Sequence, residues 1–136
     1  MVTPTLAGTR PGGAISSAWA VMHYLGIEGY RQKQQSVTRA RARIEEGVAE
    51  LGFEVLGAPK LGIMAFSHPE LDIFALYKRL FERGWVTSLC TQPKALHLML
   101  SPFHETVVAQ YLTDLTWAVA QVRAGVTDAV TEVRYS

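Results

Sequence analysis

Apolar residues recur with the 3.6-residue spacing of an α-helix in four stretches of this 136-residue chain. The first stretch is predicted to end at Gly26, with a second break at Gly29, before a longer helix begins. Gly52 and Gly84 are predicted to end the second and third helices. The four predicted helices cover residues 15–25, 30–51, 72–83 and 108–122.

Between these helices the apolar spacing changes to two, which is typical of β-strands. Strands are predicted over residues 53–55, 61–66, 85–89 and 96–100. The Leu61–Phe66 stretch is apolar almost throughout, which predicts a strand covered on both faces. In the last strand Leu96 and Leu98 point one way, while His97 and Met99 point the other. Both faces of that strand are largely apolar, so we expect the second face to be an interface.

The order of elements predicts an α+β fold, in which a small antiparallel sheet is covered on one face by helices. Short connections between neighbouring strands favour antiparallel pairing, and one covered face is the simplest two-layer packing. We divide the chain into a loop over residues 1–13, a small α+β domain over 14–125 and a tail over 126–136.

The composition fits a globular domain and excludes several classes of function. The chain is 49% hydrophobic and 18% charged with a net charge of +1, which indicates no nucleic-acid partner. Cys90 is the only cysteine, so the chain has no internal disulfide and suits the reducing cytoplasm. No apolar run reaches the roughly 20 residues of a membrane span.

No glycine-rich nucleotide motif, nucleophile elbow or metal-ligand spacing occurs, so no complete active site is encoded. Two features remain as candidates. The run Gly8-Thr9-Arg10-Pro11-Gly12-Gly13 precedes a helix and offers a hydroxyl and free N–H groups, which suits a phosphate; the alternative is a tight turn with a helix cap. His97 is the second, and its alternative is a histidine held by hydrogen bonds at a buried interface.

The opening run Thr3-Pro4-Thr5-Leu6-Ala7-Gly8-Thr9-Arg10-Pro11-Gly12 closely resembles the S-P-T-I/L-A-G-S-R-P-G run of sphingosine-1-phosphate lyases. These enzymes depend on pyridoxal phosphate and belong to fold type I, in the group that holds the glutamate-type decarboxylases. The similarity continues in order through Ala18-Trp19-Ala20, Gly84-Trp85 and Leu96-His97-Leu98. The resemblance implies that this chain is the C-terminal domain of such an enzyme.

The resemblance also implies roles for individual residues. The opening loop reaches across a homodimer, so Gly8 and the Thr9 hydroxyl are expected to contact the cofactor phosphate of the neighbouring subunit. Arg10 is expected to hold the loop or to contact a substrate phosphate. Related amino-acid decarboxylases have an arginine at the position of His97, where it grips a carboxylate. Histidine cannot offer the two parallel N–H donors of arginine, so His97 favours an amino alcohol phosphate as substrate.

Family members carry the Schiff-base lysine in a large preceding domain, usually after a histidine, and this chain has no His-Lys pair. The chain is therefore expected to be a fragment that is inactive alone. Three functions stay open. The chain is the C-terminal domain of a lyase that yields a fatty aldehyde and phosphoethanolamine, the same domain of an amino-acid decarboxylase, or a non-catalytic interaction domain that docks on a separate cofactor-binding chain.

Overall fold

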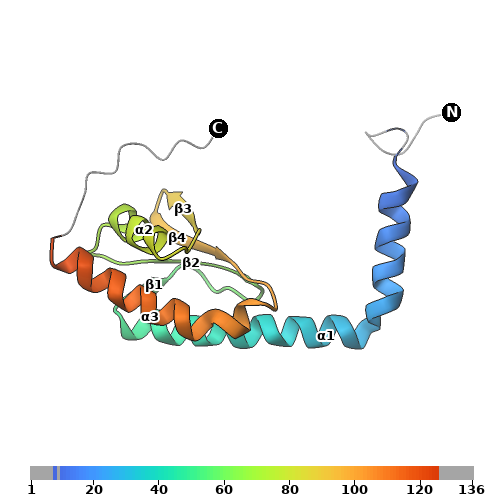
Figure 1. Cartoon of the computed structure of the whole chain (residues 1–136), viewed down its shortest axis with the longest axis horizontal. Coiled ribbons are helices and arrows are strands. Elements are labelled where there is room, and N and C mark those ends of the chain that lie inside the picture. The colour runs from blue at the N-terminus through green and yellow to red at the C-terminus, as the bar shows by residue number, and fades with distance from the viewer. Residues whose placement is uncertain (1–7, 9, 126–136) are drawn as a thin grey trace. The chain divides into compact units, whose positions relative to one another are not determined.

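The structure is a computed structural model that describes residue 8 and residues 10–125 (Figure 1). The chain forms two compact units, Met1–Gln32 and Lys33–Ser136, which are described separately. The proposed domain limits at residues 13 and 125 remain predictions, and the tail over 126–136 lies outside the described residues. None of the described helices is long and apolar enough to cross a membrane.

Helix α1 spans Gly12–Glu50 and has one kink, at Gly26. The φ of Gly26 is 57° and its ψ is −177°, a conformation that glycine adopts without a steric penalty. The predicted break at Gly26 is confirmed, and the predicted break at Gly29 is wrong because helical backbone continues through it. Glycine lowers helix propensity by only about 1 kcal/mol and does not by itself end a helix.

The sheet contains four antiparallel strands in the order β1-β2-β4-β3. Its strands are β1 (Glu54–Val55), β2 (Ile63–Ser67), β3 (Ser88–Thr91) and β4 (Lys94–Met99). Met64 lies opposite Leu98 and Phe66 opposite Leu96, so these four side chains share one face of the sheet. All four are buried, and they form the floor of the core.

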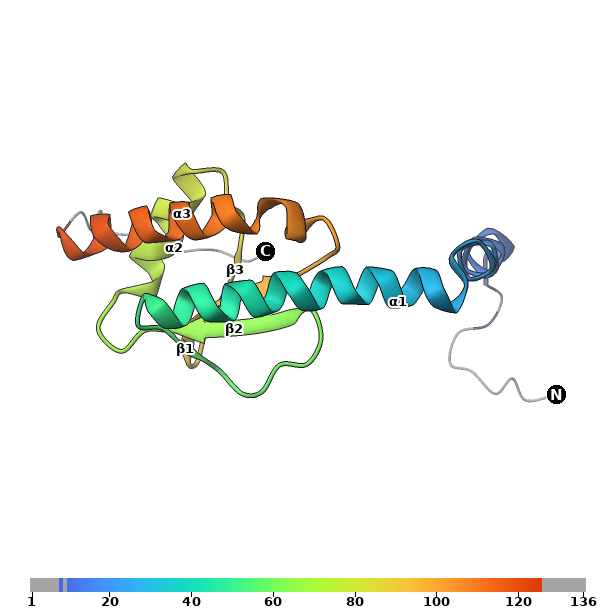
Figure 2. The same cartoon turned by 90° about the horizontal axis from the view of Figure 1, so that it is seen from below.

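Helices cover this face, as predicted (Figure 2). They are the second half of α1, α2 (Ile73–Glu82) and α3 (His104–Arg123). Asp72 caps α2 by accepting a hydrogen bond from the Phe74 N–H at 2.9 Å. Both views show α3 beside the second half of α1, and an ion pair between Arg39 and Glu105 links the two helices.

The structure corrects two strand predictions. Strand β2 is not covered on both faces, because Met64 is buried while Ile63 is 59% exposed on the opposite face. Strand β3 begins at Ser88 rather than at Trp85, and it extends to Thr91, which pairs with Lys94 across a two-residue turn. The Trp85–Thr87 segment lies outside the sheet, because the indole of Trp85 donates a hydrogen bond to Asp114 on α3.

Candidate functional site

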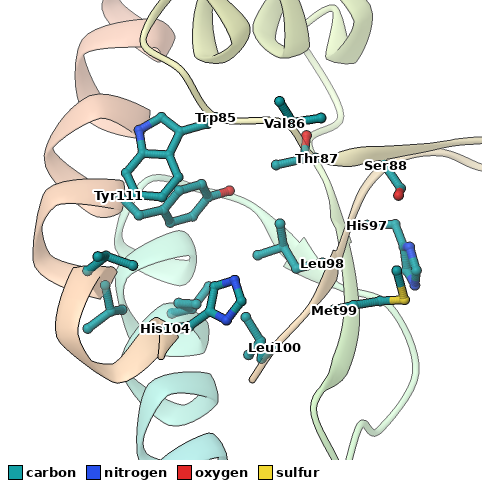
Figure 3. Close-up of a pocket in the computed structure, with 13 residues that line it drawn as sticks. Trp85, Val86, Thr87, Ser88, His97, Leu98, Met99, Leu100, His104 and Tyr111 are labelled. Carbon is teal, nitrogen blue, oxygen red and sulfur yellow. The ribbon is translucent and has the colours of Figure 1, made fainter. Parts of the chain in front are cut away.

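A cleft of about 140 Å³ opens where this segment separates from β4 (Figure 3). The β3–β4 pairing stops at Ser88 and His97, although β4 continues to Met99. The cleft therefore occupies the place where further strand pairing would lie. Its walls are residues 85–88, the end of β4, the first turns of α3 and one side chain of α1. All of these residues belong to the second unit.

His97, a predicted substrate residue, lies on the rim of this cleft. Figure 3 shows its ring beside Met99 and pointing away from Leu98 and Tyr111. The ring is half-buried. Among the described residues no hydrogen-bond partner holds it, so the hydrogen-bonded alternative finds no support there. Its nitrogens are therefore available to a ligand or to another polypeptide.

The other histidines near the sheet have structural roles. His68 is buried, and its Nδ1 accepts hydrogen bonds from the Glu70 and Leu71 N–H groups at 3.1 and 3.2 Å. His104 Nδ1 accepts from the Ser101 N–H at 2.8 Å, which closes the turn before α3. A backbone N–H can only donate, so in the neutral ring the proton of His104 lies on Nε2.

A buried network centred on Asp114 fixes the wall of the cleft. Trp85 Nε1 donates to Asp114 Oδ2 at 2.9 Å, and Gln110 Nε2 donates to the same oxygen at 3.1 Å. The Trp85 ring also packs edge-to-face on Tyr111. The indole hydrogen bond lowers the pKa of Asp114, burial opposes this, and Gln110 and Arg83 lower it further. Sequence reasoning missed this network, although an aspartate within the apolar stripe of α3 signals it.

We expect Asp114→Asn to destabilise the chain by about 1–2 kcal/mol at neutral pH, the worth of a buried hydrogen bond to a charged acceptor. A carboxylate whose pKa is lowered by folding stabilises above its unfolded pKa of about 3.9 and loses this contribution as the pH falls through its folded pKa. The difference between wild type and variant should therefore shrink below about pH 4. Urea titrations at several pH values measure this difference in the free energy of unfolding. Glu46→Gln, at an exposed position, is the control. A difference that does not vary with pH would contradict the assignment.

The predicted phosphate loop belongs to the first unit. Gly8 and Arg10 are exposed, and Thr9 lies outside the described residues. This loop and His97 belong to different units and are described separately. Their assignments as cofactor- and substrate-binding residues remain predictions.

Among residue 8 and residues 10–125, no lysine has the surroundings of a covalent anchor for pyridoxal phosphate. Such a lysine lies in a shielded pocket that lowers its pKa. Lys33, Lys60 and Lys94 are exposed, and Lys78 lies half-buried on α2. None of them lines the cleft beside His97.

Comparison with known proteins finds homologues of this chain among pyridoxal-phosphate-dependent enzymes. Sphingosine-1-phosphate lyase of Arabidopsis thaliana is 40% identical over 124 residues, which is 90% of this chain and 23% of that protein. A probable L-tyrosine/L-aspartate decarboxylase of Methanothermobacter thermautotrophicus is 37% identical over 98 residues, 72% of this chain and 27% of the relative. The chain is a homologue of sphingosine-1-phosphate lyases and group II decarboxylases. No protein-family model matches it.

Two solved structures have the same fold as this chain. The sphingosine-1-phosphate lyase of Burkholderia pseudomallei superposes with a TM-score of 0.83 at 29% identity, over 91% of this chain and 29% of that one. Glutamate decarboxylase of Lactobacillus brevis superposes with a TM-score of 0.73 at 17% identity, over 88% of this chain and 31% of that one, which shows the fold alone. The α+β fold is that of a C-terminal domain of fold type I. The chain spans about a quarter of the length of the first two curated relatives.

Proposed function

We propose that this chain is the C-terminal domain of a pyridoxal-phosphate-dependent lyase that cleaves a phosphorylated sphingoid base to a fatty aldehyde and phosphoethanolamine. The observation that carries the proposal is similarity to sphingosine-1-phosphate lyase over 90% of the chain. His97 on the rim of the cleft adds to it, because a histidine there suits an amino alcohol phosphate and offers no fork for a carboxylate.

In this proposal the Schiff-base lysine lies on a large cofactor-binding domain outside this sequence. The intact enzyme contains both domains and is a homodimer. Bound there, pyridoxal phosphate supplies an electron sink for the bond cleavage. Support comes from the first unit, where seven large apolar side chains of α1 are exposed. So many exposed large apolar side chains in one segment are typical of a surface that packs on another protein. These side chains are Ile15, Trp19, Val21, Met22, Tyr24, Ile27 and Tyr30.

The site residues have separate tasks in the proposed enzyme. Gly8 lets the backbone approach the phosphate of the neighbouring subunit's cofactor, and the Thr9 hydroxyl donates to it. Arg10 holds the loop or contacts the substrate phosphate. His97 faces the polar end of the substrate. The proposal places the enzyme in the cytoplasm, on the support of a single free cysteine, Cys90.

The test is a chimaera in which this chain replaces the matching region of the Burkholderia pseudomallei lyase, which shares its fold. We expect the purified chimaera to release phosphoethanolamine from a sphingoid base phosphate. We expect the 136-residue chain alone to release none and to retain no pyridoxal phosphate after dialysis. A cofactor band that persists in the isolated chain would contradict the proposal.

An amino-acid decarboxylase is the second candidate, and the Methanothermobacter relative favours it. The same chimaera separates the two reactions, because carbon dioxide release from L-tyrosine, L-aspartate or L-glutamate reports decarboxylation. Release of carbon dioxide without phosphoethanolamine would contradict the lyase proposal and support the decarboxylase. A third candidate is a non-catalytic domain that docks on a cofactor-binding chain, and it predicts a chimaera that binds cofactor but turns over neither substrate class.

Replacing Thr9 tests the phosphate contact. In the chimaera we expect Thr9→Ala to weaken cofactor retention by about 1 kcal/mol, roughly fivefold, because one hydrogen bond to the phosphate is lost. Thr9→Ser keeps the hydroxyl and should retain the cofactor as wild type does. Dialysis followed by absorbance measures how much cofactor each protein retains. Equal retention in wild type and both variants would mean that Thr9 does not contact the cofactor phosphate.

A further inference from the structure

The side chain that would close over His97 is held away from it. Ser88 is paired with His97, and this is the last pair between β3 and β4. Two more residues of antiparallel pairing would place Val86 opposite Met99. Side chains two positions apart on a strand share one face, so Val86 would then lie on the same face as Ser88 and His97. Because Figure 3 shows the His97 ring beside Met99, Val86 would border that ring.

The sequence of this segment suits a strand, yet residues 85–87 are outside the sheet. Trp85, Val86 and Thr87 are residue types that strands favour. Val86 is 78% exposed and Met99 is 66% exposed, so their pairing would remove apolar surface of both from water. Figure 3 shows the Val86 side chain apart from Met99. A contact outside the sheet therefore holds the segment off β4.

Two hydrogen bonds anchor Trp85, and one of them sets the direction of the segment. The Trp85 N–H donates to the Leu80 carbonyl at 3.0 Å, which closes the end of α2 and fixes where the segment begins. The indole Nε1–H donates to Asp114 Oδ2 at 2.9 Å, and the indole packs edge-to-face on Tyr111. Both of these partners lie on α3, so the indole directs the segment toward the helices and away from the end of β4. Its acceptor is a carboxylate, which makes this the stronger kind of hydrogen bond.

We propose that Trp85 and Asp114 are positioning residues whose hydrogen bond keeps Val86 out of the space beside His97. A ligand then reaches the His97 ring from the face of the sheet opposite the helices. Without the bond, residues 86–87 extend β3, and the Val86 side chain covers that approach. The statement that this ligand is the substrate rests on the proposed function, whereas the statement about Val86 does not.

The chemical reactivity of His97 in the full 136-residue chain tests the proposal. Diethyl pyrocarbonate modifies accessible imidazole rings, and mass spectrometry gives separate rates for His97 and for the exposed His23. Trp85→Phe keeps an aromatic ring and removes the N–H. We expect it to slow modification of His97 by about twofold or more, because losing a hydrogen bond to a charged group shifts a two-state equilibrium by about tenfold or more. The rate at His23 should not change, and a mere loss of stability would instead speed modification of His97.

Matched variants separate the hydrogen bond from other effects. Trp117→Phe removes an indole N–H from α3 outside the cleft and should leave the rate at His97 as in wild type. Asp114→Leu breaks the same bond from α3 and should act as Trp85→Phe does, so the test does not depend on one variant. Adding Val86→Ala to Trp85→Phe removes the covering side chain and should restore the rate at His97.

Kinetics of the chimaera test the statement about the substrate. Trp85→Phe should raise KM for the sphingoid base phosphate and leave kcat nearly unchanged, because saturating substrate restores the open arrangement. A KM that does not rise while modification of His97 slows overturns that statement. An unchanged or faster rate at His97 in Trp85→Phe, or a double variant as slow as the single one, overturns the proposal. A wild-type chimaera without lyase activity contradicts the proposed function, and the rates at His97 still decide whether the hydrogen bond positions Val86.

Discussion

Replacing Phe66 with alanine should lower the free energy of unfolding by about 3–5 kcal/mol, the cost typical of truncating a buried aromatic side chain. Phe66 is fully buried in the middle of β2 and packs edge-to-face on Phe53 with a centroid distance of 5.4 Å. Its loss removes contacts to both neighbouring strands and to the helices above them. Because small domains are stable by only about 5–15 kcal/mol, this loss would remove a large share of the stability.

Phe81 provides the matched control for this truncation. It is 55% exposed near the end of α2, so Phe81→Ala should change the free energy of unfolding by no more than about 1 kcal/mol. Urea unfolding followed by circular dichroism measures both variants. Equal effects at the two positions would mean that the sheet face carrying Phe66 is not the core.

The periodicity of apolar residues predicted the fold because each element has a single buried face. The stripe of Val37, Ala40, Ile44 and Val48 on α1 is buried as its spacing indicates. Leu96 and Leu98 likewise face the helices while Met99 faces away, as alternation along a strand requires. These predictions depend on local spacing alone, which the sequence contains.

The start of β3 and the cleft could not be predicted in this way. Trp85 alternates with Thr87 and Leu89 as a strand residue would, but its indole is held by Asp114, which is 29 positions away in the sequence. A tertiary hydrogen bond between distant residues overrides the local pattern. The cleft is a consequence of that displacement, so it becomes visible only in the structure. The residue types of the run that holds Gly8, Thr9 and Arg10 made it a candidate phosphate loop, whereas the individual roles of these residues across a dimer came from the family resemblance.

Replacing His97 should have the largest effect on catalysis. In the chimaera we expect His97→Ala to lower kcat/KM for the sphingoid base phosphate by about 10–100-fold, the worth of a hydrogen bond to a charged group. The ring is half-buried and has no partner among the described residues, so its removal should leave the melting temperature nearly unchanged. His97→Gln keeps one N–H donor and should recover part of the activity. Steady-state kinetics and thermal melts on the same preparations measure both.

His97→Arg distinguishes the two substrate classes. An arginine there presents two parallel N–H groups to a carboxylate, so we expect the ratio of decarboxylation to lyase activity to rise, with lyase activity falling. Thr91→Ala, at the exposed far end of the hairpin, is the positional control and should leave both activities unchanged. If the alanine variant keeps full lyase activity, His97 does not contact the substrate. If alanine and arginine reduce activity only as far as they reduce the melting temperature, the role of His97 is structural.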